Sequence, residues 1–294
     1  MNNVAAVIVT YNRLEMLKEC ISKLLEQDYV CDILIVNNAS TDNTEEYILE
    51  NFSSNSRVLY KNTGANLGGA GGFNYGIRWA VELKYEFIWV MDDDCMPTKG
   101  ALKEFIQYDS LNKGKYGFLS SKVLWKDGTI CKMNIQRKTM YRNVKDFNSK
   151  AVPICMASFV SFFVPSYVIK EVGLPIKEFF IWTDDWEFTR RISLKYKSYL
   201  INDSVVIHKS ASNIGANIVS TSLDRLERFK YLYRNDVYLY KREGVKGYIY
   251  ELVRLTVHSL KVLLLAPNKL VRLKILFSST IEGFSFNPSI EMIN

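Results

Sequence analysis

The sequence predicts an α/β fold in which a mostly parallel central sheet is flanked by helices and followed by a helical C-terminal segment. Two observations carry this prediction. Strand and helix patterns alternate through the first hundred residues, and the strands are near-continuous apolar runs. Such runs are typical of parallel strands that helices cover on both faces. The composition, 48% hydrophobic and 23% charged over 294 residues, is ordinary for a globular protein.

The alternation begins at the N-terminus. Residues 4–9 form an apolar strand pattern, and Leu and Ile recur at helical spacing over residues 14–25. Residues 33–36 predict the second strand. Asp42, with Glu45 three residues later, predicts a capping box at the start of the next helix.

Further alternation follows. Residues 58–60 predict a short third strand, residues 72–83 a helix, and residues 87–91 a strongly apolar fourth strand. Short strand patterns and turn residues over 116–165 predict an antiparallel extension, which ends in a buried strand over 158–165.

The rest of the chain predicts a strand over 204–207 and helices from about residue 224 onward. We therefore expect one domain over 1–223, in two halves of about 1–115 and about 116–223, and a basic, aromatic-rich helical segment over 224–294.

Polar segments follow three of the parallel strands, at Thr10–Arg13, Asn37–Asp42 and Asp92–Asp94. The carboxyl ends of parallel strands meet at one edge of a sheet, so these segments should share one cleft. Three adjacent carboxylates repel one another unless a cation holds them, and Mg²⁺ or Mn²⁺ prefers such oxygen ligands. His208, at the end of a strand, is a candidate third ligand. The alternatives are a solvated acidic turn and a structural histidine.

Residues 62–76 hold six glycines in fifteen positions. Glycines allow a backbone to approach a ligand closely, and the N-terminus of the following helix favours anions. The segment is not a P-loop, and Asn74 stands where a dinucleotide fingerprint needs its third glycine. We expect a ligand-binding loop; a flexible loop without a ligand is the alternative.

A second acidic cluster contains Asp184, Asp185 and Glu187, with Trp182 and Trp186 on either side of Asp185. Helix capping would explain Asp184 and Glu187 but leaves Asp185 over. A carboxyl group beside apolar rings can have its pKa raised, which suits a general base. The indole rings offer flat surfaces on which sugars can stack.

The net charge of +7 is concentrated in residues 224–278, which hold twelve Lys or Arg against five Asp or Glu. Basic residues among aromatics suit an anionic membrane surface, although the tail could equally pack on its own domain. No nucleic-acid motif accompanies the charge. We expect a cytoplasmic protein for three reasons. The five cysteines form no CxxC pair, the chain shows no signal-peptide pattern, and it contains no run of about eighteen apolar residues.

Together these segments resemble glycosyltransferase family 2, the inverting enzymes of the GT-A fold. The matching motifs are Val7–Arg13, Val36–Asp42, Asn66–Gly69, Asp92–Asp94 and Thr183–Glu187. They cover roughly residues 4–210. The resemblance implies that residues 1–223 are the catalytic domain, with a nucleotide-sugar half, about 1–115, and an acceptor half, about 116–223. Within the family, Asn66–Phe73, the triple aspartate and the Trp-Thr-Asp-Asp pattern are most similar to bacterial galactofuranosyltransferases, and rhamnosyltransferases share part of the set.

The resemblance implies a role for each matching residue. The donor-binding residues would be Thr10, Tyr11, Arg13, Asn38, Asn66, Gly68, Gly69 and Asp93. The metal ligands would be Asp92, Asp94 and His208, with Mn²⁺ or Mg²⁺ as the cofactor. Asp185 would be the general base. The residues that orient donor and acceptor would be Trp182, Asp184, Trp186 and Glu187. Asn38 departs from the aspartate that the family often has, which leaves base specificity open.

The implied function is metal-dependent, inverting transfer of galactofuranose from UDP-galactofuranose to a hydroxyl of a glycan or polyprenyl-linked glycan in cell-surface polysaccharide synthesis. The alternatives are a rhamnosyltransferase that uses dTDP-rhamnose and a non-catalytic nucleotide-sugar-binding scaffold. A sugar-1-phosphate nucleotidyltransferase lacks support, since its opening glycine-rich loop is missing. Residues 224–278 would attach the protein to the inner face of the cell membrane, or mediate homo-oligomerisation.

Overall fold

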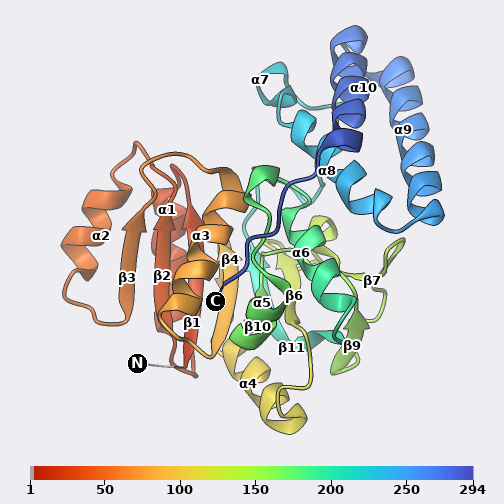
Figure 1. The fold of residues 1–294 in the computed structure, drawn as a ribbon. Coiled ribbons are helices and arrows are strands. Elements are labelled where there is room, and N and C mark those ends of the chain that lie inside the picture. The colour runs from red at the N-terminus through yellow and green to blue at the C-terminus, as the bar shows by residue number, and fades with distance from the viewer. Residues whose placement is uncertain (1–2, 294) are drawn as a thin grey trace.

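The computed structural model describes residues 3–293, in which a nine-stranded sheet lies between layers of helices and a helical group gathers at one end (Figure 1). The strands are β1 (Val4–Thr10), β2 (Asp32–Asn37), β3 (Val58–Asn62), β4 (Phe87–Asp92), β5 (Cys95–Pro97), β6 (Leu119–Trp125), β9 (Ala151–Ile154), β10 (Phe162–Pro165) and β11 (Ser198–His208). A separate hairpin consists of β7 (Arg137–Thr139) and β8 (Arg142–Asn143). The helices of this part are α1 (Leu14–Leu25), α2 (Thr44–Phe52), α3 (Gly68–Glu82), α4 (Ala101–Asn112), α5 (Ser166–Val172) and α6 (Asp184–Ser193).

The sheet runs in the order β3-β2-β1-β4-β10-β6-β11-β5, with β9 also paired to β11. The strands β1 to β4 are parallel, and β10 is antiparallel to both of its neighbours. Every residue of β1 and β2 is buried, as the continuous apolar runs require. The predicted α/β class, the parallel first half and the antiparallel extension are therefore confirmed.

Helix α3 packs closely on the sheet because two of its glycines lack side chains. A Cβ atom on Gly72 would lie 2.5 Å from Val9 Cγ1, and one on Gly76 would lie 2.5 Å from Val7 Cγ1. The glycine-rich segment was predicted to be a ligand-binding loop ahead of a helix from residue 72. The helix instead begins at Gly68, and these two glycines serve helix-sheet packing.

Other boundaries also differ from the predictions. The buried strand predicted over 158–165 covers only Phe162–Pro165, and the strand predicted over 204–207 extends back to Ser198. The predicted capping box is wrong. Asp42 accepts from Thr44 two residues on, whereas Glu45 accepts from Asn62 at 2.8 Å. Glu45 is thus engaged by a residue of β3, so the reciprocal contact of a capping box does not form.

The C-terminal part forms α7 (Leu223–Leu226), α8 (Phe229–Lys241), α9 (Val245–Leu265) and α10 (Lys269–Ser285), which are grouped at the upper right of Figure 1. The helical prediction holds only to Ser285. Residues 286–293 run back along the first domain, where Glu291 pairs with Arg78 of α3 and with Lys177. Within residues 3–293, no helix has both the length and the hydropathy to cross a membrane.

Candidate active site

The acidic end of β4 is held by Arg13, which lies between β1 and α1. Arg13 Nη1 donates to Asp93 Oδ1 at 2.9 Å, and its Nη2 donates to Asp94 Oδ2 at 2.8 Å. The other oxygen of Asp93 accepts from Thr10 Oγ1 at 2.8 Å. The loop after β2 joins this edge, since Asn12 Oδ1 accepts from the backbone NH of Thr41 at 2.7 Å. The three strand ends therefore lie together, as predicted.

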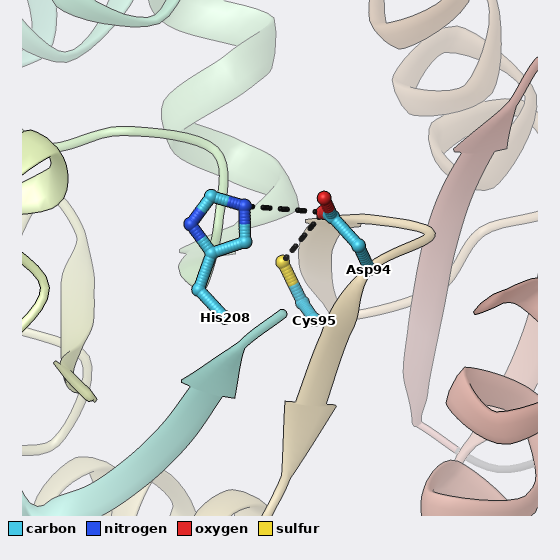
Figure 2. Close-up of side chains that lie close together, drawn as sticks. All are labelled: Asp94, Cys95 and His208. Carbon is cyan, nitrogen blue, oxygen red and sulfur yellow. Dashed lines mark hydrogen bonds and ion pairs between the residues drawn. The ribbon is translucent and has the colours of Figure 1, made fainter. Parts of the chain in front are cut away.

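His208 reaches the same acidic end from β11. Its Nε2 lies 3.2 Å from Asp94 Oδ1 (Figure 2). Its Nδ1 lies 2.8 Å from Asn134 Oδ1. Burial alone would lower the pKa of His208, but the hydrogen bond and charge of Asp94 outweigh burial and raise this pKa to about 10. Burial would raise the pKa of Asp94, but the hydrogen bonds and charges of His208 and Arg13 hold this pKa at about 2. The two residues form a charged pair.

The residues around this pair fit a divalent cation. Ligand atoms of Asp94, Cys95 and His208 lie within 4.8 Å of one another (Figure 2). A carboxylate and a neutral imidazole suit Mn²⁺ or Mg²⁺, so a bound ion would take the place of the proton between His208 and Asp94. Asn134 Oδ1 lies by the second ring nitrogen, as protein groups commonly do beside a metal. Burial and the charge of Asp94 raise the pKa of Cys95 well above its ordinary value, so its thiol stays protonated and is a poor ligand. Asp92, the other predicted ligand, lies outside this cluster.

A cleft of about 610 Å³ adjoins this pair, and its lining residues come from segments between Gly69 and Arg254. Its walls bring together most of the predicted metal and sugar residues with residues of the C-terminal helices. The lining includes Gly69, Phe73, Asp92, Asn134, Arg137, Trp182, Asp184, Asp185, Trp186, His208, Leu232, Asp236, Tyr240, Tyr250 and Arg254. The cleft therefore combines carboxylates, aromatic rings and a candidate metal ligand.

Asp184 and Asp185 open α6 at the floor of this cleft. Burial raises the pKa of Asp184 to about 7. Burial also raises the pKa of Asp185 well above its ordinary value, and the charges of Asp184 and Asp92 add to the effect. The backbone NH of Trp186 donates to Asp185 Oδ1 at 2.7 Å. A carboxylate in this setting is a strong proton acceptor once it is ionised.

The turn that presents these carboxylates is strained. Phe180, Trp182 and Thr183 all have positive φ angles, of 62°, 66° and 68°. Such a conformation persists only where surrounding contacts impose it. Asn235 of α8 supplies them, since its Nδ2 donates toward the carbonyls of Phe179 and Trp182, at 2.9 and 3.0 Å. The C-terminal helices thus shape the site as well as flank it.

A neighbouring side chain of α8 completes this clamp. Thr183 Oγ1 donates to Asp236 Oδ1 at 2.6 Å, and Asp236 Oδ2 pairs with Arg254 Nη1 at 2.6 Å. Asn235, Asp236 and Arg254 were not among the site residues predicted from the sequence. The one available signal was an Asn-Asp pair within an aromatic helical run, where polar residues need buried partners.

Several predicted donor-binding residues lie outside the cleft lining. Asn38 is buried and donates from Nδ2 to the carbonyl of Gly68 at 2.8 Å. Asn66 Oδ1 accepts from the backbone NH of Gly68 at 2.9 Å, so both residues shape the start of α3. Tyr11 is 42% exposed at the end of β1. Gly69 is the member of this group that lines the cleft.

Glu187 was predicted to orient the donor or acceptor, but the structure places it behind the cleft. Its two oxygens accept from Arg191 Nε and Nη2, at 3.0 and 2.9 Å, one helical turn away. Arg191 also donates to the carbonyl of Leu174 at 2.9 Å. These contacts anchor α6 to the loop after α5.

The fold is shared with known transferases. The structure resembles that of S. aureus TarS in complex with UDP, with a TM-score of 0.57 and 17% identity over 98% of this chain and 73% of the other. This likeness establishes a GT-A fold. A family model for Glycosyl transferase family 2 matches residues 5–164, more than half of the chain, and the protein therefore belongs to that family.

Two curated relatives are also similar. The low-salt glycan biosynthesis hexosyltransferase Agl10 of Haloferax volcanii is 24% identical over 201 residues, which are 65% of this chain and 62% of that protein. The galactofuranosyltransferase GlfT1 of Mycolicibacterium smegmatis is 36% identical over 97 residues, which are 32% of this chain and 31% of that protein. The matches thus span less than two thirds of these relatives.

Proposed function

We propose that this protein transfers a hexose, galactofuranose from UDP-galactofuranose, to a hydroxyl of a glycan or lipid-linked glycan, with inversion at the anomeric carbon. The observation that carries the proposal is the convergence of Asp92, Asp185 and His208 on one cleft, which Trp182 and Trp186 also line. Support for the donor comes from the relative named as a galactofuranosyltransferase and from the related fold that was solved with UDP.

Asp185 would act as the general base. It takes the proton from the acceptor hydroxyl while that oxygen bonds to the anomeric carbon from the face opposite the nucleotide. The bond from that carbon to the diphosphate oxygen breaks in the same displacement, and the nucleoside diphosphate leaves with the electron pair. Asp184, Trp182 and Trp186 would orient the sugars against Asp185, since all three line the cleft.

Asp94 and His208, together with Asp92, would hold Mn²⁺ or Mg²⁺. When bound, the ion supplies positive charge that stabilises a departing diphosphate. Arg13 lies beside the same carboxylates, and its side chain is 44% exposed. It can therefore exchange a carboxylate contact for a phosphate oxygen, a bidentate contact that guanidinium groups favour. Thr10, Tyr11 and Asp93 would contribute to the nucleotide side of this edge.

The C-terminal helices carry an apolar surface of the kind that binds a membrane. We define the hairpin face as the exposed large apolar side chains of α9 and α10. It comprises Val245, Tyr248, Ile249, Leu252, Val253, Val257, Leu260, Leu263, Leu264, Leu265, Leu270, Val271, Phe277, Ile281 and Phe284. Soluble monomers seldom expose so many apolar side chains together.

Cations accompany the hairpin face. Lys246, Lys261, Lys269 and Lys274 are exposed on the same helices and form no ion pair among residues 3–293. Each lysine near an anionic leaflet contributes roughly 1 kcal/mol. We therefore propose that the hairpin face rests on the inner leaflet of the cell membrane, close to lipid-linked acceptors. Self-association through this face is the competing use.

The experiment that tests the proposed function is calorimetric titration of UDP and dTDP, with and without Mn²⁺, into wild-type protein and Asp94→Ala. Metal-dependent UDP binding that Asp94→Ala abolishes supports the proposal and calls for transfer assays with UDP-galactofuranose. Preferential dTDP binding would favour the rhamnosyltransferase alternative, because the base pocket must then accept a methyl group. Binding of neither nucleotide would contradict the proposed donor site.

A further inference from the structure

Arg137 is a cation of the cleft that has no carboxylate partner among the residues the structure describes. The other cations of the lining are neutralised. Arg254 pairs with Asp236 at 2.6 Å and with Glu251 at 2.8 Å, and His208 pairs with Asp94 at 3.2 Å. The positive charge of Arg137 therefore remains available to a ligand.

The hydrogen-bonding capacity of Arg137 is also largely unused. Its guanidinium lies over the ring of Trp186, 4.5 Å from the ring centroid. Its Nη1 makes one long contact, 3.4 Å, to the carbonyl of Met140, and its buried Nε has no hydrogen-bond partner within residues 3–293. A buried donor without a partner is costly, so such donors usually serve a ligand or water.

The backbone fixes Arg137 in this position. Its NH donates to the carbonyl of Met156 at 2.9 Å, and its carbonyl accepts from the NH of Cys155 at 2.8 Å. The ring stack holds the planar fork, which suits the two oxygens of a phosphate or carboxylate. Because Trp186 directly follows Asp185, the fork lies on the sugar-acceptor side of the cleft, whereas Arg13 serves the strand-end edge.

We infer that Arg137 selects an acceptor that carries an anionic group, a phosphate or a carboxylate, near the hydroxyl that is glycosylated. The inference rests on the proposed function and deepens it. The carboxyl groups that line the same cleft, at positions 92, 184, 185 and 236, offer an ionised ligand no hydrogen-bond donor unless they are protonated. An anion is therefore accommodated at Arg137, whose guanidinium lines the cleft without a carboxylate partner among the described residues.

The test measures binding of three sugar probes, glucose 6-phosphate, glucuronate and glucose, by ligand-observed NMR, in the absence and presence of UDP and Mn²⁺. The variants are Arg137→Gln, which removes the charge, and Arg137→Lys, which keeps it. The matched control is Arg142→Gln, because Arg142 is exposed on the partner strand of the same hairpin. Thermal melts verify that each variant is folded.

Wild-type protein should bind an anionic probe at least tenfold more tightly than glucose. Arg137→Gln should lose that preference without changing glucose binding, Arg137→Lys should keep part of it, and Arg142→Gln should keep all of it. Preference for glucose 6-phosphate would identify a phosphate-bearing acceptor, and preference for glucuronate a uronate-bearing one.

Equal binding of all three probes by the wild type, or an unchanged preference in Arg137→Gln, would overturn the inference. So would a tenfold loss of UDP affinity in Arg137→Gln, because Arg137 would then serve the donor diphosphate. Failure of the wild type to bind UDP would count against the proposed function instead. The anionic preference can still be measured without nucleotide, so the two failures are distinguishable.

Discussion

Arg13 donates to Asp94 Oδ2 at 2.8 Å while the other oxygen of Asp94 faces His208, so the carboxylate that is best placed to bind a metal is already held by two cationic groups. A divalent ion and its diphosphate would have to replace or share these contacts. Arg13 therefore serves the protein twice: as countercharge of the triple aspartate without donor, and as a candidate phosphate ligand with it.

Replacing Arg13 should expose both functions. Arg13→Gln leaves the buried Asp93 without its ionic partner, so we expect the free energy of unfolding to fall by about 1–3 kcal/mol. UDP affinity in Mn²⁺ should fall at least tenfold. Urea unfolding and UDP titration measure the two effects. The control is Lys18→Gln on α1, whose pair with Glu15 is exposed and should be worth less than about 1 kcal/mol. Equal effects of both substitutions would contradict this role.

Asp185→Asn tests the proposed base. The amide cannot take a proton from the acceptor hydroxyl, so transfer should slow by about 10²–10⁴. UDP affinity should stay near that of wild-type protein, because Asp185 lies on the acceptor side. Steady-state transfer assays and UDP titration provide the two measurements, with the exposed Asp127→Asn as the control. Turnover near the wild-type rate would remove Asp185 from the mechanism.

Asp184 predicts a pH-dependent stability. Its pKa rises from an ordinary value of 3.8 to about 7, chiefly through burial. The folded protein therefore binds this proton more tightly than the unfolded chain does. The resulting stabilisation is complete below the unfolded pKa and is lost as the pH rises through about 7.

Asp184→Asn keeps the shape of the side chain but cannot ionise. Relative to wild-type protein, its Tm should be nearly unchanged at about pH 3, and the difference should grow with pH to a few degrees at about pH 8, where the wild-type carboxylate is charged. Thermal melts of metal-free protein over this range supply the measurement. A difference in Tm that does not vary with pH would show that Asp184 does not titrate in this range.

Gly76 should tolerate no added side chain. A Cβ atom there would lie 2.5 Å from Val7 Cγ1 and 2.9 Å from Val36 Cγ2, within the packed face between α3 and the sheet. Gly76→Ala should therefore lower the free energy of unfolding by about 1–3 kcal/mol through overpacking. Gly100→Ala is the control, because nothing lies within 4 Å of its added Cβ atom. Denaturant unfolding compares the two, and equal stabilities would contradict the packing argument.

The hairpin face should bind anionic membranes. Sedimentation with phosphatidylcholine–phosphatidylglycerol vesicles at low salt should carry wild-type protein down, and added salt should weaken the binding. The double variant Leu252→Asp, Leu260→Asp should reduce binding at least tenfold. Leu111→Asp is the control, since Leu111 is 83% exposed on α4 and is not part of the hairpin face. A concentration-dependent dimer without vesicle binding would instead support self-association.

Local pattern sufficed for the first half of the fold. The apolar runs of β1, β2 and β4 and the acidic turn after β4 predicted a parallel sheet with carboxylates at one edge, and the structure has that arrangement. A buried parallel strand needs apolar side chains on both faces, so its pattern survives in any one sequence. The triple aspartate predicted a cation at this edge for a related reason, because adjacent like charges at the end of a core strand need a compensating cation.

The acceptor side of the site was decided only by tertiary structure. Asn235 clamps the turn at 179–182 from about fifty residues away, Glu187 is taken by Arg191, and Arg137 reaches Trp186 from a separate hairpin. No periodicity encodes such pairings, because they depend on where distant elements meet. The sequence by itself determined the strands, their acidic ends and the chemistry those ends can perform. Packing between distant segments decided which polar side chains face the cleft and which are satisfied elsewhere.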